Sequence, residues 1–74
     1  ERWSLSRDFR ALYGTSPYRY VTQRRLELCR RLLRSGFTLA DASLAAGFFD
    51  QSHMTRHFVQ CFGLSPVRWL KMQG

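Results

Sequence analysis

Apolar residues recur along the chain at the three- and four-residue spacing of helices, and no stretch alternates with the period of two that a β-strand requires. The first row, Leu5, Phe9 and Leu12, is followed by Gly14, a residue that commonly ends a helix. Further rows and stop signals predict helices over about 17–34, 38–46, 51–62 and 66–72. The chain is therefore expected to be all-α.

The predicted helices begin at residues that favour a helix start. Ser16 and Ser65 are suitable N-caps, and each precedes a proline, whose missing N–H loses no bond at the first helical position. Thr38 is a suitable cap for the segment 38–46, with Asp41 three residues on as a weak capping box. Asp50 is the expected cap of the segment 51–62.

A seventeen-residue pattern occurs twice, at an offset of 49. Residues 5–21 read LSRDFRALYGTSPYRYV, and residues 54–70 read MTRHFVQCFGLSPVRWL. Six residues of the first copy recur unchanged in the second, namely Arg7, Phe9, Gly14, Ser16, Pro17 and Arg19. Such repetition indicates one supersecondary element used twice: a short helix, a glycine stop, a Ser-Pro restart and an aromatic anchor.

One face of each helix supplies the predicted core. Its members are Leu26, Cys29 and Leu33, with Val21, Leu28 and Leu32 in the adjacent row; Leu39, Ala42, Ala45 and Ala46; Met54, Phe58, Cys61 and Phe62; and Trp69. The two cysteines are interpreted as reduced core thiols of a cytoplasmic protein. Most arginines of the long helix should face water, namely Arg19, Arg24, Arg30, Arg31 and Arg34.

The charge of the chain favours a polyanionic partner. Twelve Lys and Arg residues against five Asp and Glu residues give a net charge of +7. Residues 1–36 carry +6 of it and residues 37–74 carry +1. Eleven of the twelve cations are arginine, whose planar guanidinium binds phosphates and guanine edges with two hydrogen bonds. The composition therefore indicates a nucleic-acid partner.

The segments 38–46 and 51–62, joined by a tight turn at Gly47, have the layout of a helix-turn-helix. In that motif the second helix lies in the major groove of DNA, with its N-terminal residues at the base edges. The polar residues expected there are Gln51, Ser52, His53, Thr55 and Arg56. Residues 1–13 look like a second recognition helix, which would present Arg2, Trp3, Ser6, Arg7 and Arg10.

The stretch GFFDQSHMTRHFVQCFGLSPVRW, preceded by RRLELCRRLL and TLADASLAAGF, resembles the DNA-binding domain of the AraC/XylS-type transcription regulators. The resemblance covers essentially the whole chain. It depends on the landmarks Gly47-Phe48, Arg56-x-Phe58, Phe62-Gly63 and Ser65-Pro66, and on Leu5-Ser6-Arg7-x-Phe9 upstream. The chain departs from the family pattern at Ala42 and Ser43, where a bulky aliphatic residue followed by Ala is common, so that thinner packing is expected there.

The resemblance implies two helix-turn-helix units joined by a long central helix. Residues 1–74 would then be one domain: 1–16 the remnant of the first unit, 17–36 the linker helix, and 37–74 the second unit with a closing helix. The first unit lacks its leading helix, so a fragment or partly ordered domain is expected. Two recognition helices would enter successive major-groove segments of double-stranded DNA, the first through Trp3, Ser6 and Arg7. An upstream effector-binding domain and contact with RNA polymerase are also implied.

Several of these residues allow a second interpretation. Arg7 and Arg56 could pair with an acid on a neighbouring helix instead of contacting guanine or phosphate. Arg2 and Arg10 could be solvated charges, and Trp3 could belong to the core. A further expectation concerns Arg25, which could join the two halves of the domain through a hydrogen bond rather than contact DNA.

Other functional classes have weaker support. His53, His57 and Cys61 have a spacing that could place metal ligands on one side of a helix, but a tetrahedral site needs further donors. No catalytic triad pattern or Gly-rich phosphate loop occurs, so neither an enzyme nor a cofactor is predicted. The alternative from another class is a basic amphipathic module that binds a protein or a membrane surface. It does not account for the repeat, and no membrane partner is predicted.

Overall fold

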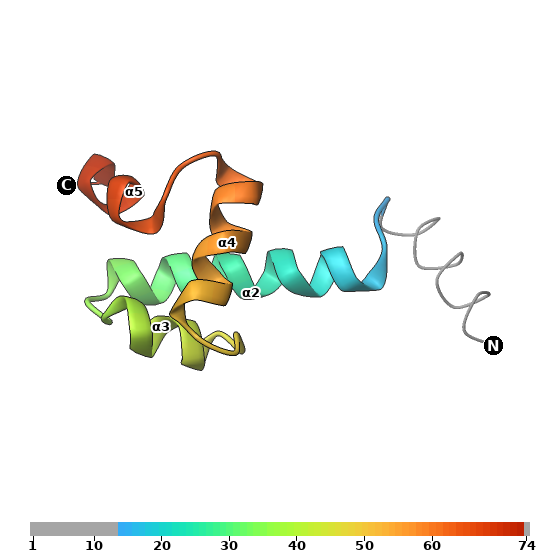
Figure 1. Cartoon of the computed structure of the whole chain (residues 1–74), viewed down its shortest axis with the longest axis horizontal. Helices are drawn as coiled ribbons and strands as arrows, with labels where there is room; N and C mark the ends of the chain where they lie inside the picture. Colours follow the sequence, from blue (N-terminus) through green and yellow to red (C-terminus); the bar gives the residue numbers. More distant parts are fainter. Residues whose placement is uncertain (1–13, 74) are drawn as a thin grey trace.

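The computed structural model describes residues 14–73, which form four α-helices and no β-strand. They are α2 (Pro17–Arg34), α3 (Leu39–Ala45), α4 (Gln51–Phe62) and α5 (Pro66–Gln73). Figure 1 shows α2 running along the length of the molecule, with α3 beside its C-terminal half and α4 crossing it. The all-α prediction is confirmed. Within residues 14–73, no helix combines the length and apolar content needed to cross a membrane.

Local signals account for the positions at which these helices begin. Each predicted cap accepts a hydrogen bond from the backbone N–H three residues on: Ser16 from Arg19 at 3.3 Å, Thr38 from Asp41 at 3.1 Å, Asp50 from His53 at 2.8 Å and Ser65 from Arg68 at 3.3 Å. Such bonds satisfy N–H groups that have no partner inside the helix. Gly63 ends α4 with φ of 81°, in the left-handed region predicted for it.

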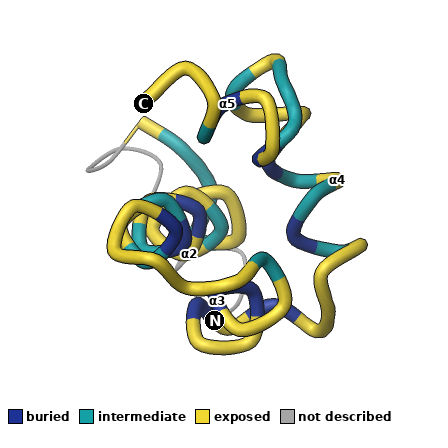
Figure 2. The backbone as a smooth tube through the Cα atoms, turned by 90° about the vertical axis from the view of Figure 1, so that its left-hand side faces the viewer, coloured by how far each residue is buried: buried dark blue, intermediate teal, exposed yellow. Residues whose placement is uncertain are grey.

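The core lies where α2, α3 and α4 meet, and Figure 2 shows the buried positions of the helices facing one another. Leu26, Cys29 and Leu33 of α2 are buried, as predicted, and so are Met54 and Phe58 of α4. The Phe58 ring meets the ring of Phe62 with centroids 4.7 Å apart and that of Trp69 at 5.8 Å, both edge-on. These aromatic contacts fasten α5 to the rest of the domain.

Three residues predicted to be buried are exposed instead. Cys61 is exposed and lines an open pocket between α4 and the first half of α2, whereas Cys29 is buried. Val21 is 43% exposed because it lies in that same first half, outside the buried cluster. Ala45 is exposed because α3 turns Ala42, Ser43 and Ala46 towards its neighbours. The apolar pattern gave the correct helices but extended the core too far.

Arg30 was predicted to face water, and the structure corrects this. Its guanidinium lies over two aromatic rings, 4.6 Å from the Phe62 centroid and 5.1 Å from the Trp69 centroid. Its Nε is buried without a hydrogen-bond partner among the described residues. A cation over an aromatic face gains about 0.5–2 kcal/mol, depending on how far it is desolvated. Arg30 therefore helps to fasten α5 to α2.

Small side chains line the contact surface of α3. Ala42 and Ser43 are both fully buried, at the two positions where the resemblance leads us to expect a bulky aliphatic residue followed by Ala. The Ser43 hydroxyl donates a 2.6 Å hydrogen bond to the Leu39 carbonyl, so it is satisfied within its own helix. Burying this hydroxyl therefore leaves no unpaired polar group beneath the helix-turn-helix.

Candidate nucleic-acid interface

The turn between α3 and α4 leaves no room for a side chain at its first residue. Gly47 has φ of 95°, a conformation that other residues rarely adopt. A Cβ built there would lie 3.0 Å from Nε of Arg25, whose side chain therefore crosses the turn from α2. We expected Arg25 to join the two halves through a hydrogen bond. Within residues 14–73 it packs against the turn without forming one.

The rest of the turn is held by a buried ring and by backbone hydrogen bonds. Phe48 is 4% exposed, and its N–H donates to the Ser43 carbonyl at 2.9 Å. Asp50, two residues on, caps α4. The start of α4 is therefore anchored to α3 on one side and to its own first turn on the other.

α4 keeps one side open to solvent. Gln51, Ser52 and Arg56 are exposed and Thr55 is partly exposed. Val59, 42% exposed, continues the row because Ser52, Arg56 and Val59 are spaced at i, i+4 and i+7. We call these five side chains the reading face of α4. Val59 was not predicted as a site residue, although the same spacing could have identified it.

Arg56 forms no ion pair with any other residue of the described range 14–73. The structural alternative considered for it, an acidic partner on a neighbouring helix, therefore has no support in that range. Its guanidinium keeps its hydrogen-bond donors available on the reading face. Such a donor set matches the two acceptors of a guanine edge or a phosphate.

His53 differs from the other predicted site residues because its ring turns towards the protein. Nδ1 accepts a hydrogen bond from the Phe49 N–H at 3.2 Å, and Nε2 lies 3.2 Å from Nε2 of His57. The ring also meets the edge of the Phe48 ring, with centroids 5.6 Å apart. A base contact by His53 would have to replace these interactions.

The rings of His53 and His57 form a pair in contact. Because Nδ1 of His53 accepts a hydrogen bond, a neutral His53 carries its proton on Nε2 and donates it to His57. The pKa of His57 is lowered by burial, and also by the positive charges of His53 and Arg56. Protonating His57 would place two N–H groups against each other.

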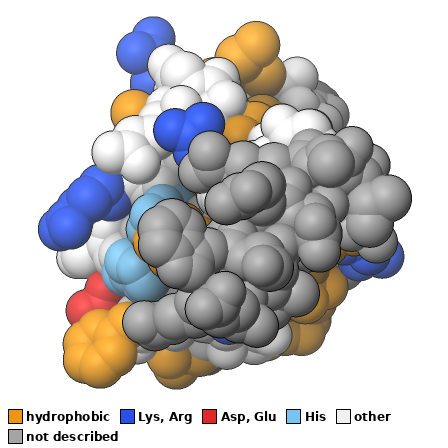
Figure 3. All heavy atoms as spheres, turned by 90° about the vertical axis from the view of Figure 1, so that its right-hand side faces the viewer, with side chains coloured by type: hydrophobic (Ala, Val, Ile, Leu, Met, Phe, Trp, Pro, Cys, Tyr) orange, Lys and Arg blue, Asp and Glu red, His pale blue; other side chains and the backbone are white. Residues whose placement is uncertain are grey.

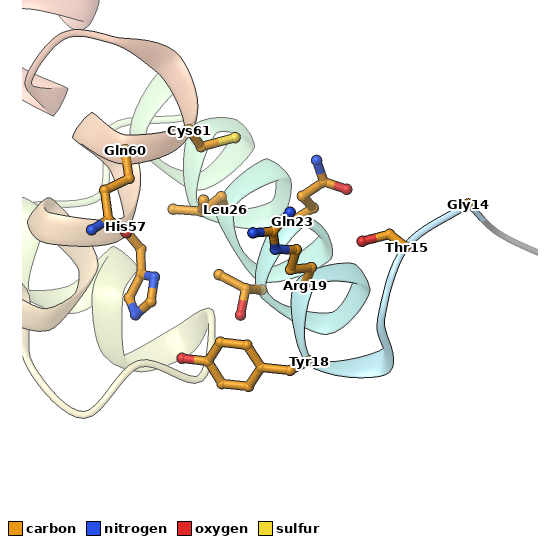
Figure 4. A pocket seen from close by; sticks show the side chains of 10 residues that line it. Gly14, Thr15, Tyr18, Arg19, Gln23, Leu26, His57, Gln60 and Cys61 are labelled. Carbon is orange, nitrogen blue, oxygen red and sulfur yellow. The ribbon is translucent and has the colours of Figure 1, made fainter. Parts of the chain in front are cut away.

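His57, but not His53, lines the pocket that Cys61 also lines. This open pocket of about 690 Å³ lies between α4 and the first half of α2, with Leu26 beside Thr22 and Gln23 on the α2 side. Figure 4 shows Tyr18 of α2 and His57 of α4 reaching into the same opening, and their ring centroids are 6.3 Å apart. The pocket is separate from the reading face, whose members do not line it.

Positive charge surrounds these elements. Residues 14–73 contain nine Lys and Arg residues against three Asp and Glu residues, a net charge of +6. Figure 3 shows the two histidines on one face, with blue Lys and Arg side chains projecting around its rim. No group of three metal-ligating side chains occurs within the described residues, and the exposed Cys61 does not complete a set with the histidines.

Half of the predicted site lies outside the described residues. Arg2, Trp3, Ser6, Arg7 and Arg10 all belong to residues 1–13, so the structure does not describe the first recognition helix. The layout of the domain into 1–16, 17–36 and 37–74 likewise remains a prediction. The described geometry concerns the second helix-turn-helix.

Comparison with known proteins also identifies a helix-turn-helix domain, along nearly the whole chain. Residues 1–72 match a family described as a helix-turn-helix domain. The chain is 34% identical over 61 residues to the HTH-type transcriptional regulator ExsA of Pseudomonas aeruginosa, a match covering 81% of the chain and 22% of that protein. It is 46% identical over 59 residues to the transcriptional activator NphR of a Rhodococcus species, covering 78% and 18%.

A putative AraC-like transcription regulator of Streptomyces lividans is 35% identical over 71 residues, which cover 95% of the chain and 23% of that relative. The chain thus spans about a fifth of the length of the curated relatives it matches. No solved structure is a significant match. With α3, the Gly47 turn and α4 arranged as a helix-turn-helix, these matches show that the chain belongs to the AraC-type helix-turn-helix family.

Proposed function

We propose that this chain binds DNA sequence-specifically as part of a bacterial transcription regulator, and that α4 reads base edges in the major groove. The observation that carries the proposal is the reading face: polar side chains stay open to solvent along a helix whose opposite side, Met54 and Phe58, is buried. The relatives support it, because their names describe transcriptional regulators and activators.

The reading face suggests a role for each side chain. Arg56 would donate two hydrogen bonds to guanine O6 and N7, a contact that provides about 1–3 kcal/mol of discrimination. Gln51 is suited to an adenine edge, while Ser52 and Thr55 can bond either a base edge or a phosphate. His53 belongs in this proposal as a support for the start of α4, because both of its ring nitrogens have partners within the protein.

The sequence repeat extends the proposal to a second recognition helix. Residues 5–21 repeat the pattern of residues 54–70, and α2, which begins inside the first copy at Pro17, is an unbroken helix of 18 residues. Arg2, Trp3, Ser6, Arg7 and Arg10 would then face a neighbouring major-groove segment, about 34 Å along the duplex. An upstream effector-binding domain, contact with RNA polymerase and a cytoplasmic location complete the proposal.

Selection of binding sites from random duplexes tests both parts. We expect two short conserved blocks about 10–10.5 base pairs apart, one for each recognition helix. Affinity should fall steeply as salt increases, with a slope of about −0.9 for each phosphate neutralised. A single conserved block would contradict the proposal that residues 1–13 contain a second recognition helix. A flat salt response, or equal retention on anionic vesicles, would favour the membrane-surface alternative.

Arg56→Ala gives the sharper test of α4. We expect it to lose about 1–3 kcal/mol of preference at particular base pairs of one block, because the bidentate contact is lost. Arg31→Ala is the matched control, since Arg31 is an exposed arginine of α2, and it should weaken all duplexes alike. Arg30 is unsuitable as a control because it packs on Phe62 and Trp69. Equal, sequence-blind losses in both variants would contradict base reading by α4.

A further inference from the structure

Phe49 is the most exposed of the large apolar side chains in the described part of the chain. It is 83% exposed, whereas Phe48 beside it is 4% exposed. The domain therefore gains almost no burial from the Phe49 ring, although an exposed ring carries a cost in hydration. A polar residue at this position would leave the described core unchanged, so the ring calls for a role outside the fold.

The backbone on both sides of this ring is fixed. The Phe49 N–H donates to Nδ1 of His53 at 3.2 Å, and the Phe48 N–H donates to the Ser43 carbonyl at 2.9 Å. Asp50 holds the other side by accepting the His53 N–H at 2.8 Å. The ring thus extends into solvent from a preorganised turn, which reduces the entropy lost when it contacts a partner.

The position of the ring relative to the reading face identifies that partner. Phe49 lies two residues before Gln51, at the end of α4 that approaches base edges in a helix-turn-helix. The nearest cation along the chain, Arg56, lies on the reading face, and the chain as a whole carries +7, which favours a nucleic-acid partner. In the major groove the apolar group available to such a ring is the C5-methyl group of thymine.

We infer that Phe49 is a specificity-determining residue that contacts a thymine C5-methyl group at the edge of the block read by α4. The inference rests on the proposed DNA-binding function. It adds an apolar contact to the hydrogen bonds that Gln51, Ser52 and Arg56 would make with base edges.

Replacing single thymines by deoxyuridine tests this contact, since the two bases differ in the methyl group alone. With the full chain and a selected duplex, we expect one replacement in the α4 block to weaken binding about fourfold, the factor for burying one methyl group. Arg56→Ala identifies that block by its lost base preference. Phe49→Ser should bind the thymine and deoxyuridine duplexes equally, while Phe49→Leu, still apolar, should keep most of the difference.

Met72→Ala is the matched control, because Met72 is also exposed, at 75%, but lies on α5. It should retain the fourfold preference for thymine. The inference is overturned if the wild-type chain binds the duplex specifically yet tolerates every deoxyuridine, or if Phe49→Ser loses affinity for both duplexes without losing the preference. Unchanged DNA binding by Phe49→Ser, with the preference for thymine retained, would also overturn it. If no duplex is bound, the proposed function fails first and this inference fails with it.

Discussion

The two ends of α4 are held in place by different chemistry. At its C-terminal end, Phe58 and Phe62 pack edge-on against each other, and Phe58 also packs on Trp69, with Arg30 covering the aromatic surface. At its N-terminal end, where Met54 and the Phe48 ring are also buried, hydrogen bonds add to the packing: the Asp50 cap, the Phe49 N–H to His53, and the His53–His57 pair.

This difference separates stability from recognition. Burial of large apolar side chains supplies most of the free energy of folding, about 1.5–3 kcal/mol for each, whereas a hydrogen bond contributes about 0.5–1.5 kcal/mol net. Hydrogen bonds are directional, however, so they fix the orientation of the residues that would approach DNA in the proposed complex. Substitutions at the aromatic end should mainly lower the free energy of unfolding. Substitutions at the hydrogen-bonded end should mainly lower the sequence specificity of DNA binding.

The largest effect is expected at the aromatic end. Phe58→Ala should cost about 3–5 kcal/mol, because it removes a fully buried ring and leaves a cavity. That loss equals the whole stability expected of a domain this small, so helical circular dichroism should show an unfolded chain at 25 °C. Val67→Ala, at a position 46% exposed on α5, is the control and should change stability by less than about 0.5 kcal/mol.

A smaller effect is expected at the hydrogen-bonded end. Asp50→Ala should lower the free energy of unfolding by about 1 kcal/mol in urea titrations, because the His53 N–H loses its cap. Binding of the selected duplex should weaken in addition, since the start of α4 loosens. Glu27→Ala is the control, because it changes an exposed acid in the middle of α2, away from any helix start. A loss as large as that of Phe58→Ala would break the contrast between the two ends.

The smallest effect concerns pH. Burial, with the charges of His53 and Arg56, lowers the pKa of His57 below its ordinary value near 6.5. Below about pH 6.5 the unfolded chain therefore takes up a proton that the folded chain resists, and stability falls as the pH falls. Above that pH this residue adds no pH dependence.

Urea midpoints at pH 7.5 and pH 5.5 measure this effect. The wild-type midpoint should be lower at pH 5.5, and His57→Gln should reduce the difference between the two values. Tyr18, which packs near the His57 ring, and Arg56, whose charge lowers the pKa of His57, are the same in both proteins. The comparison therefore isolates the imidazole of His57. An unaltered pH difference in His57→Gln would show that the histidine pair does not carry it.

Local sequence signals predicted the helices well but predicted the limits of the core poorly. The bounds 17–34 and 51–62 match α2 and α4 because Ser16-Pro17, Asp50 and Gly63 act through bonds to residues three or four positions away. The environments of Cys61 and Arg30 depend instead on how far neighbouring helices extend over them. A helical pattern identifies the apolar side of a helix. It gives no information about how much of that side the neighbouring helices bury.

The candidate site shows the same division. Arg56 and Ser52 were predicted from their spacing, and both lie on the exposed side of α4. The inward orientation of His53 depends on a turn that brings the Phe49 N–H to its ring, and the exposure of Phe49 depends on Phe48 filling the core in its place. Two adjacent phenylalanines are indistinguishable in the sequence, so the choice between them comes from the turn geometry.

The contact between Arg25 and Gly47 has a consequence for the spacing of the two base-pair blocks in the proposed binding site. Arg25 belongs to α2, and its Nε lies 3.0 Å from the place that a Cβ at Gly47 would take, so this side chain packs between the long helix and the turn of the second helix-turn-helix. If two recognition helices bind DNA as proposed, exchanging Arg25 for a shorter side chain should leave the preferred bases of each block intact. It should instead widen the range of base-pair spacings tolerated between the blocks.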